Sequence, residues 1–288
     1  MKFLQYRDIK SFYKDTYNIL LRHEAQNIIP LGNIIIGNQG NDQFGWRDTS
    51  KWFMATVSDD TRIQLTAVMT PPFNLTLYAT DNRINDEALT CLANEIVKNN
   101  IHIPMVMTEK VLAECFAKIY SKKKGLKYSI FKTLRLYEIL TVNPKIPLIG
   151  SLRLAENKDL AFLPYWIEGF NNAWYGISQN ELKDYERHYY EIASRKLYIL
   201  EDNGIPVAMA KITREMQDIF SVGMAYSPPF FQNIGYTVSC IAGVTRIGLA
   251  KGFSKAVGIT DLANSTIQKL DSKIGGTTIC DCLEIKFE

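Results

Sequence analysis

The 288-residue sequence contains no long apolar run. Its longest apolar stretch, near residues 28–36, is interrupted by Pro30 and Gly32 and is shorter than the ~18 residues that a membrane-spanning helix needs. An apolar signal core is also missing, because residues 1–4 lead directly into polar positions. We therefore expect a cytoplasmic protein that has no membrane partner.

Cysteine and histidine are scarce. The five cysteines, an odd number, stand at positions 91, 115, 240, 280 and 282, which argues against a secreted disulfide framework in a chain of this length. Cys280 and Cys282 would share one face of a strand, but no second cysteine pair or histidine accompanies them. We expect reduced thiols and no metal site.

The sequence also lacks a strong charge of one sign. Its formal net charge is +3, and neither half is strongly basic, so we expect no nucleic-acid partner. With 47% hydrophobic and 22% charged residues, the composition is that of a globular protein and excludes disordered or low-complexity classes. The length predicts two domains or one large one.

Apolar periodicity predicts the same order of elements in both halves, namely hairpin, strand, helix, strand, helix, strand. In the first half we expect helices at 8–23, 86–98 and 108–121, and strands at 51–57, 63–68, 75–79, 102–106 and 128–142. In the second half we expect helices at 157–171, 180–195, 238–248 and 265–273, and strands at 152–155, 197–200, 207–213, 220–226, 256–260 and 277–287. Pro144 and Pro147 mark a boundary between two α/β units.

The most informative segment follows the strand that ends at Tyr226. Pro228 and Pro229 stop the strand, and a lone Gly235 opens the next helix. A turn over residues 232–237 would leave several backbone N–H groups free at a helix N-terminus, which suits an anion such as a pyrophosphate. A plain structural turn is the competing interpretation of this segment.

Three groups of residues resemble the GNAT superfamily of acyl-CoA-dependent N-acetyltransferases. Gln232 and Gly235 match the first and fourth positions of its phosphate loop, and the segment from Gly258 to Asn264 resembles its next strand and the asparagine after it. Residues 70–75, 151–160 and 227–229 resemble a bacterial subgroup with two GNAT-like parts.

This resemblance implies an α/β fold of two acyl-CoA N-acyltransferase (GNAT)-like units, each a mixed, mostly antiparallel sheet flanked by helices. Residues 1–145 would form a degenerate unit without a cofactor site, and residues 146–288 the acetyl-CoA-binding catalytic unit. In the first unit the chain lacks a glycine loop, and Asp81 would repel a pyrophosphate.

Site residues follow from the same resemblance. The backbone of Met224, Ala225 and Tyr226 would bind the pantetheine arm, and an N–H group there would polarise the thioester carbonyl. The pyrophosphate would be bound by the loop residues Gln232, Asn233, Ile234, Gly235, Tyr236 and Thr237. Asn264 would bond the pantetheine arm, and Lys269 would reach a phosphate of coenzyme A.

The loop and the following helix depart from the family pattern. Asn233, Ile234 and Thr237 replace Gly, Lys and Gly or Ala, and Asp271 occupies the position of the tyrosine that usually protonates the leaving thiolate. An ionised Asp271 would repel that thiolate, so Tyr236 or a water would have to supply the proton.

Two functions, and a third idea of a purely structural pairing domain, remain open from the sequence. The favoured one is acetyl transfer from acetyl-CoA to an amine by direct attack in a ternary complex, and the alternative is a coenzyme A-binding sensor or interaction module with little turnover. The acceptor amine, its general base and the oligomeric state are not specified. Candidate bases are Glu168, His188, Glu215 and Asp218, each of which competes with an ordinary surface or packing role.

Overall fold

The computed structural model describes residues 1–40, 48–176, 185–263 and 272–288. The chain divides into two compact units. Unit 1 comprises Met1–Leu136, Thr260–Ile267 and Thr278–Glu288, and unit 2 comprises Tyr137–Ile259 and Gln268–Thr277. The last strand thus belongs to unit 1, although it follows unit 2 in the sequence. The predicted division into residues 1–145 and 146–288 has a single boundary and therefore assigns this strand to the second unit.

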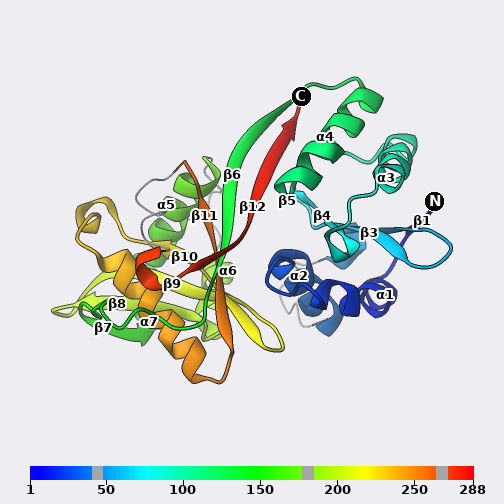
Figure 1. Cartoon of the computed structure of the whole chain (residues 1–288). Coiled ribbons are helices and arrows are strands. Elements are labelled where there is room, and N and C mark those ends of the chain that lie inside the picture. The colour runs from blue at the N-terminus through cyan, green and yellow to red at the C-terminus, as the bar shows by residue number, and fades with distance from the viewer. Residues whose placement is uncertain (41–47, 177–184, 264–271) are drawn as a thin grey trace. The chain divides into compact units, whose positions relative to one another are not determined.

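Unit 1 is a sheet with helices on both faces. Its strands lie in the order β1 (Lys2–Gln5), β2 (Phe53–Ser58), β3 (Ile63–Met69), β4 (Leu75–Ala79), β5 (Met105–Glu109), β12 (Thr277–Phe287) and β6 (Tyr128–Ile139). Its helices are α1 (Ile9–Leu21), α2 (Ile28–Gln39), α3 (Asp86–Lys98) and α4 (Lys110–Lys124), with short 3-10 turns η1 (Thr49–Lys51) and η2 (Thr80–Asn82). Figure 1 shows α3 and α4 on one face of strands β3 to β5 and α1 and α2 on the other.

Local sequence features explain how helices α3 and α2 of unit 1 begin. The Asn85 side chain accepts a hydrogen bond from Ala88 N at the start of α3, and Leu92 and Ile96 of that helix are buried against the sheet. Helix α2 forms despite Pro30, because this proline lies in the first helical turn, where its missing N–H costs nothing.

The start of α4 differs from the expectation. Thr108 was the predicted cap, but it still belongs to β5, and its hydroxyl donates to the Leu77 carbonyl at 2.6 Å. The cap is Glu109, whose carboxylate accepts from the N–H groups of Val111 and Leu112 at 3.1 and 3.2 Å.

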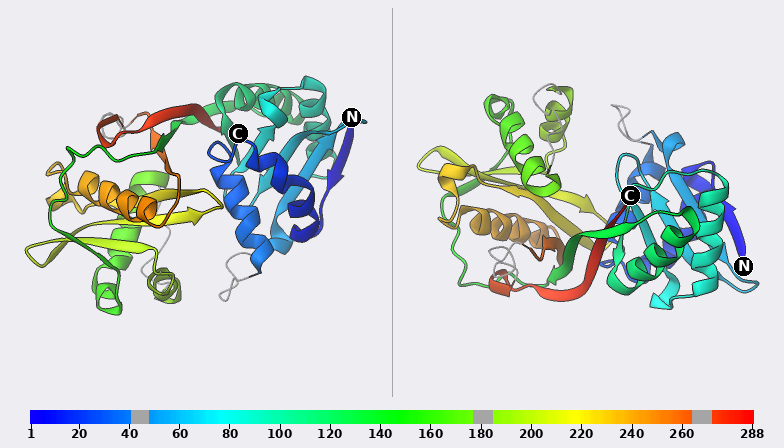
Figure 2. Two further views of the ribbon diagram at one scale, coloured as in Figure 1. Left: turned by 60° about the horizontal axis from the view of Figure 1, so that its bottom comes forward. Right: turned by 90° about the horizontal axis from the view of Figure 1, so that it is seen from above.

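Unit 2 repeats the plan of unit 1. Its strands lie in the order β7 (Ser151–Leu154), β8 (Leu197–Asp202), β9 (Ile205–Glu215), β10 (Ile219–Tyr226) and β11 (Lys255–Asp261). Helices α5 (Leu163–Tyr175) and α6 (Tyr185–Ala193) cover one face of this sheet and α7 (Tyr236–Ala250) covers the other, as Figure 2 shows on the left. Short turns η3 (Asn157–Ala161) and η5 (Pro229–Phe231) complete the unit.

One predicted helix of unit 2 is interrupted in the structure. The helix expected at 157–171 is divided into η3 and α5, because Phe162 leaves helical geometry (φ −132°, ψ −22°) before Pro164 restarts the helix. The helix expected at 265–273 lies almost wholly outside the described residues.

Both units share the same strand connectivity. Four strands pair antiparallel in chain order, and a crossover helix then leads into a strand parallel to the fourth: β4–α3–β5 in unit 1 and β10–α7–β11 in unit 2. The predicted fold class, two α/β units of like topology with mixed, mostly antiparallel sheets, is confirmed.

Candidate functional site

The parallel strands β10 and β11 pair only at their beginnings. Ile219, Phe220 and Ser221 lie opposite Lys255, Ala256 and Val257, and the pairing stops there. The remaining residues of both strands, 222–226 and 258–261, therefore form no ladder with each other, which leaves backbone donors and acceptors of β10 available on the β11 side. This is the divergence that the sequence resemblance implies at this point.

A β-bulge lies in the same part of β10. Gly223 is opposite Lys211 and Tyr226 is opposite Met209, so Met224 and Ala225 together oppose the single residue between them on β9. Met224 adopts a left-handed conformation with φ of 51°, which is uncommon for a side chain of its size. The bulge removes the backbone of Met224 and Ala225 from the regular ladder, where a ligand can use it.

The loop after β10 presents a row of free amides. Two left-handed residues, Asn233 (φ 64°) and Gly235 (φ 104°), turn the chain into α7. The backbone N–H groups of residues 233–238 donate to no acceptor among the described residues, and the first bond of the helix runs from Ser239 N to Gly235 O. Consecutive free N–H groups at the N-terminus of a long helix attract an anion.

Side-chain hydrogen bonds connect the two ends of this loop with Ser227. Gln232 Nε2 donates to the Ser227 carbonyl at 3.0 Å, and the hydroxyls of Ser227 and Thr237 are 2.9 Å apart. Ile234 is 54% exposed, and a Cβ on Gly235 would meet only Ile149 Cδ1, at 3.5 Å. The backbone of Gly235 is therefore open to a ligand, although its left-handed φ disfavours any other residue there.

Tyr236, the first residue of α7, is bound to the β8–β9 hairpin. Its hydroxyl donates to Asp202 Oδ2 at 2.6 Å, and this bond, followed by desolvation, raises the pKa of Tyr236. A phenol that already donates to a carboxylate is a poor source of a proton for a thiolate. In this structure the Tyr236 hydroxyl is thus engaged with Asp202, and whether it can serve as the acid that the sequence left open stays a prediction.

The Tyr226 ring packs on α5, a contact that no sequence pattern predicted. Its centroid is 6.4 Å from that of Trp166, and a Cβ on Gly169 would lie 2.4 Å from its hydroxyl. Burial raises the pKa of Tyr226. Only a glycine at position 169 allows this close approach, which fixes the end of β10 against the helix.

Three predicted residues lie outside the described residues: Asn264, Lys269 and Asp271. Their proposed roles toward the pantetheine arm, a phosphate and the leaving thiolate thus stay predictions. The other predicted positions, residues 224–226 and 232–237, occur together at the end of β10 and the start of α7.

The predicted acceptor-side residues differ in their surroundings. Glu215 pairs with Lys196 and, at 3.8 Å, with Lys251, and Asp218 lies exposed in the β9–β10 turn. His188 on α6 is fully buried, and Glu168 on α5 is half-buried.

A buried ion pair that the sequence analysis missed lies on the same face of unit 2. Glu191 of α6 pairs with Lys211 of β9, and their side chains are only 10% and 12% exposed. Spacing along the sequence could not reveal it, because 20 residues separate the two partners. The ion pair is thus a buried polar contact between α6 and the sheet, beside the apolar cluster that α5 forms with β8 and β9.

Unit 1 carries a carboxylate where unit 2 carries the free amides. After β4, Asp81 bonds Arg22 and Arg62, each at 3.1 Å, and the bond to Arg22 lowers the pKa of Asp81. Asp81 and Asn82 are left-handed, and Gln26 donates to the Asn82 side chain at 2.9 Å. The segment between α1 and α2 is thus bonded to this turn, which holds a negative charge of its own.

Two further observations concern metals and membranes. Over residues 1–40, 48–176, 185–263 and 272–288, no group of three or more His, Cys, Asp or Glu side chains is placed to bind a metal ion. No helix in these same ranges has the length and apolar character needed to cross a membrane.

The comparison with known proteins rests on structure. Neither a protein-family model nor a curated protein matches the sequence. A GNAT-family acetyltransferase from Colwellia psychrerythraea aligns over 100% of this chain and 99% of its own, with a TM-score of 0.60 and 13% identity. A GCN5-related N-acetyltransferase from Sphaerobacter thermophilus aligns over 99% and 95%, with a TM-score of 0.62 and 11% identity.

A protein with two such parts is also similar. A tandem GNAT protein from the clavulanic acid biosynthesis pathway aligns over 100% of this chain and 98% of its own, with a TM-score of 0.55 and 8% identity. At these identities the likeness establishes the fold. Over its whole length, therefore, the chain has the two-part GNAT acetyltransferase fold that its sequence resembles.

Proposed function

We propose that unit 2 is an acetyl-CoA-dependent N-acetyltransferase. The observation that supports this most strongly is the row of backbone N–H groups at 233–238, which have no acceptor in the described part of the chain, next to strands that diverge after Ser221. A diphosphate fits the amides because they are at a helix N-terminus, and an extended amide-bearing arm fits an unpaired strand edge because it can bond as a further strand does.

Each part of the site has a task in this proposal. The amides of residues 233–237 bind the pyrophosphate, and Gln232 and Thr237 keep the loop in shape through Ser227. Backbone groups of Met224 and Tyr226 orient the pantetheine arm, and an N–H group of the bulge polarises the carbonyl of the acyl group. Bound acetyl-CoA supplies a thioester, which an amine attacks directly.

We further propose that this site is confined to residues 146–288. The corresponding turn of unit 1 has the Asp81 carboxylate bonded to two arginines in place of free amides. A pyrophosphate there would have to displace that carboxylate and would be repelled by it.

One observation favours a second function. Asp271 stands where the resemblance expects the tyrosine acid, and the Tyr236 hydroxyl is already bonded to Asp202. Without a proton donor for the thiolate, unit 2 would bind coenzyme A and turn over slowly, as a sensor or an interaction module does.

Acetyl-CoA with and without amines separates these functions. The transferase predicts a higher unfolding temperature with acetyl-CoA and release of free thiol that depends on an added amine, tested with a small alkylamine, an aminoglycoside and a lysine-containing peptide. The sensor predicts the same stabilisation without thiol release. Absence of stabilisation contradicts both.

A further inference from the structure

Cys280 and Cys282 form a thiol pair in unit 1 that the proposed acetyl transfer does not use. They are alternate residues of β12, so their side chains lie on the same face of the strand. Their sulfur atoms are 3.9 Å apart. Asp281 lies between them on the opposite face, where Arg135 Nε and Nη2 donate to its two carboxylate oxygens at 2.7 and 3.0 Å.

The two thiols differ in their access to solvent. Cys282 is 3% exposed, whereas Cys280 is partly exposed. A reagent in solution can thus reach Cys280 first, while Cys282 stays protected behind it. Such an arrangement, an accessible thiol with a second thiol in contact, suits an attacking and a resolving cysteine.

The two thiols also differ in how readily they ionise. Their sulfurs are within hydrogen-bond distance, and donation from the Cys282 thiol lowers the pKa of Cys280, whereas burial and the carboxylates of Glu109 and Asp281 raise it. The same bond and burial raise the pKa of Cys282. Cys280 is therefore the thiol that ionises first.

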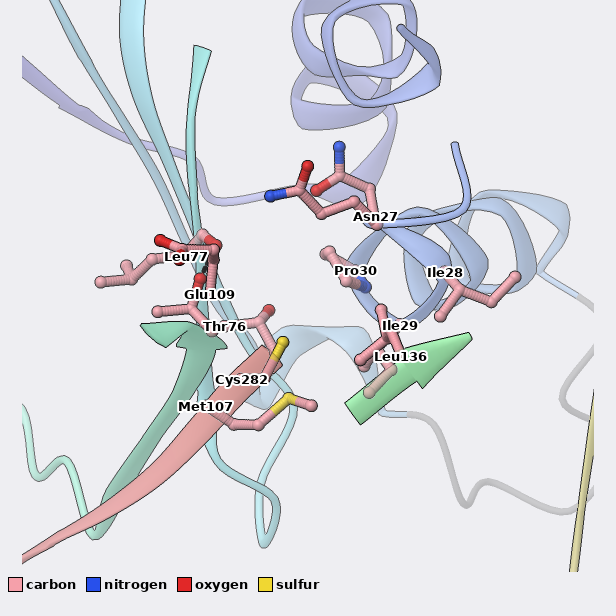
Figure 3. A pocket seen from close by; sticks show the side chains of 12 residues that line it. Asn27, Ile28, Ile29, Pro30, Thr76, Leu77, Met107, Glu109, Leu136 and Cys282 are labelled. Atoms are coloured by element: carbon pink, nitrogen blue, oxygen red, sulfur yellow. Dashed lines mark hydrogen bonds between the residues drawn. The ribbon is translucent and has the colours of Figure 1, made fainter. Parts of the chain in front are cut away.

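Cys282 lies on the wall of a small cavity of about 20 Å³ beside Thr76 and Met107 (Figure 3). The ladder between β12 and β5 runs from Lys286 to Cys282 and stops there, so Cys280 has no partner on β5. Because a disulfide needs its sulfurs about 2 Å apart, β12 must bend locally; no ladder holds residue 280 on the β5 side, whereas on its other side β12 lies next to β6.

We propose that Cys280 and Cys282 are an oxidation site, at which a low-molecular-weight disulfide converts the dithiol into an intrachain disulfide. The Cys280 thiolate attacks one sulfur of the small disulfide, the S–S bond of that molecule breaks, and its second half leaves as a thiolate that takes up a proton. The Cys282 thiol then loses its proton and attacks the Cys280 sulfur, which releases the first half as a second thiol. The protein is oxidised by two electrons, and the small disulfide is reduced to two thiols.

Oxidised glutathione tests this proposal on the native full-length protein. After incubation at neutral pH, alkylation of the remaining thiols and digestion with trypsin, both cysteines lie in the single peptide 274–286. The proposal predicts that this peptide loses two hydrogen atoms and gains no alkyl group. A peptide that is alkylated twice, or that retains glutathione on Cys280, contradicts it.

Variants define the order of the steps. Cys282→Ser is expected to keep glutathione on Cys280, because the resolving thiol is missing, whereas Cys280→Ser is expected to leave Cys282 unmodified. Cys115→Ser is the matched control and should still form the disulfide between Cys280 and Cys282. In the unmodified protein, iodoacetamide should label Cys280 roughly tenfold faster than Cys91 or Cys115, whose pKa values burial raises. Equal rates for these thiols would overturn the assignment of Cys280 as the attacking residue.

Discussion

The hydroxyl of Tyr236 donates to Asp202 Oδ2 at 2.6 Å and thereby ties the first residue of α7 to the β8–β9 hairpin. The same residue follows Gly235 and its free amides directly, so the bond holds one end of the proposed anion-binding loop. The loop is thus positioned by a hairpin that is more than 30 residues away in the sequence.

Loss of this bond should loosen the loop. We predict that Tyr236→Phe weakens coenzyme A binding roughly two- to fivefold, because the loop amides then have to be ordered by the ligand. Asp202→Asn, which retains an acceptor oxygen, should have the smaller effect. Calorimetric titration of both variants checks this, and equal affinities for the unmodified protein and Tyr236→Phe would remove the positioning role.

Gly235→Glu should abolish coenzyme A binding. The substitution places a carboxylate among the free amides and forces a side chain into a φ of 104°, so we expect affinity to fall at least about 100-fold. Gly252→Glu is the matched control, since Gly252 has a φ of 99° at the other end of α7 and no atom within 4 Å of its Cβ position. If the two variants lose affinity equally, backbone strain and not the anion site explains the loss.

Ile234→Lys should strengthen binding. Ile234 is 54% exposed in the loop, so a lysine there adds a positive charge near the amides without disturbing the core. We expect a gain of roughly three- to tenfold in affinity for coenzyme A that decreases as salt is added. Ile234→Gln controls for polarity alone. A lysine variant with unchanged or weaker affinity at low salt argues that no phosphate lies at this loop.

Asp271→Tyr tests the missing acid. If proton donation to the thiolate limits the reaction, restoring a phenol should raise amine-dependent thiol release by about tenfold or more. Acetyl-CoA binding measured on the same variant shows whether the ligand site is intact. An unchanged rate with intact binding means that another group, or a water, already supplies the proton.

The packing of Tyr226 on Gly169 makes a prediction about stability. Gly169→Ala places a Cβ 2.4 Å from the Tyr226 hydroxyl, and we expect the free energy of unfolding to decrease by about 1–3 kcal/mol. In a Tyr226→Leu background the same substitution should cost much less, because the ring is gone. Urea unfolding of the four proteins measures both costs, and equal costs in the two backgrounds contradict the contact.

Acid should weaken the ion pair at the start of unit 2. Asp159 is 1% exposed and bonded to Arg153 at 2.6 Å. Burial alone raises its pKa, but the Arg153 guanidinium and the Glu156 amide outweigh burial, so the pKa of Asp159 is lower in the folded protein than in the unfolded chain. Its contribution is present above the unfolded pKa near 4 and is lost as the pH falls through the folded value.

Replacement of this carboxylate gives a measurable loss. Asp159→Asn should destabilise the protein by about 2–4 kcal/mol at neutral pH, because the half-buried Arg153 loses one of its two carboxylate partners and retains only Glu201. The difference from the unmodified protein should shrink in acid, where Asp159 is protonated in both states. A difference that stays constant from neutral pH to pH 3 would show that charge does not cause the loss.

Local patterns predicted the features that depend on neighbouring residues. Pro228 and Pro229 end β10 and Gly235 opens α7, because proline and glycine act on their own backbone. The repeated order of strands and crossover helices followed from apolar periodicity for the same reason. These features predicted two α/β units of like topology and the position of the loop, whereas the mixed, mostly antiparallel sheets were implied by the resemblance to the GNAT superfamily.

Features that depend on distant residues were not predictable in this way. The return of β12 to unit 1, the contact of Tyr226 with Gly169 and the bond of Tyr236 with Asp202 each join segments far apart in the sequence. Nothing in the composition of either segment identifies its partner. Sequence analysis accordingly left Tyr236 open as a proton donor, a role that its bond to Asp202 does not favour.

Titration of coenzyme A into the purified protein, followed by calorimetry, tests the central claim most directly. The claim is that the amides at 233–237 bind the diphosphate of this ligand. It predicts one binding site per chain, with an affinity on the order of micromolar that is lost in Gly235→Glu and retained in Gly252→Glu. Absence of binding heat at several temperatures, or equal binding by Gly235→Glu, would contradict the claim.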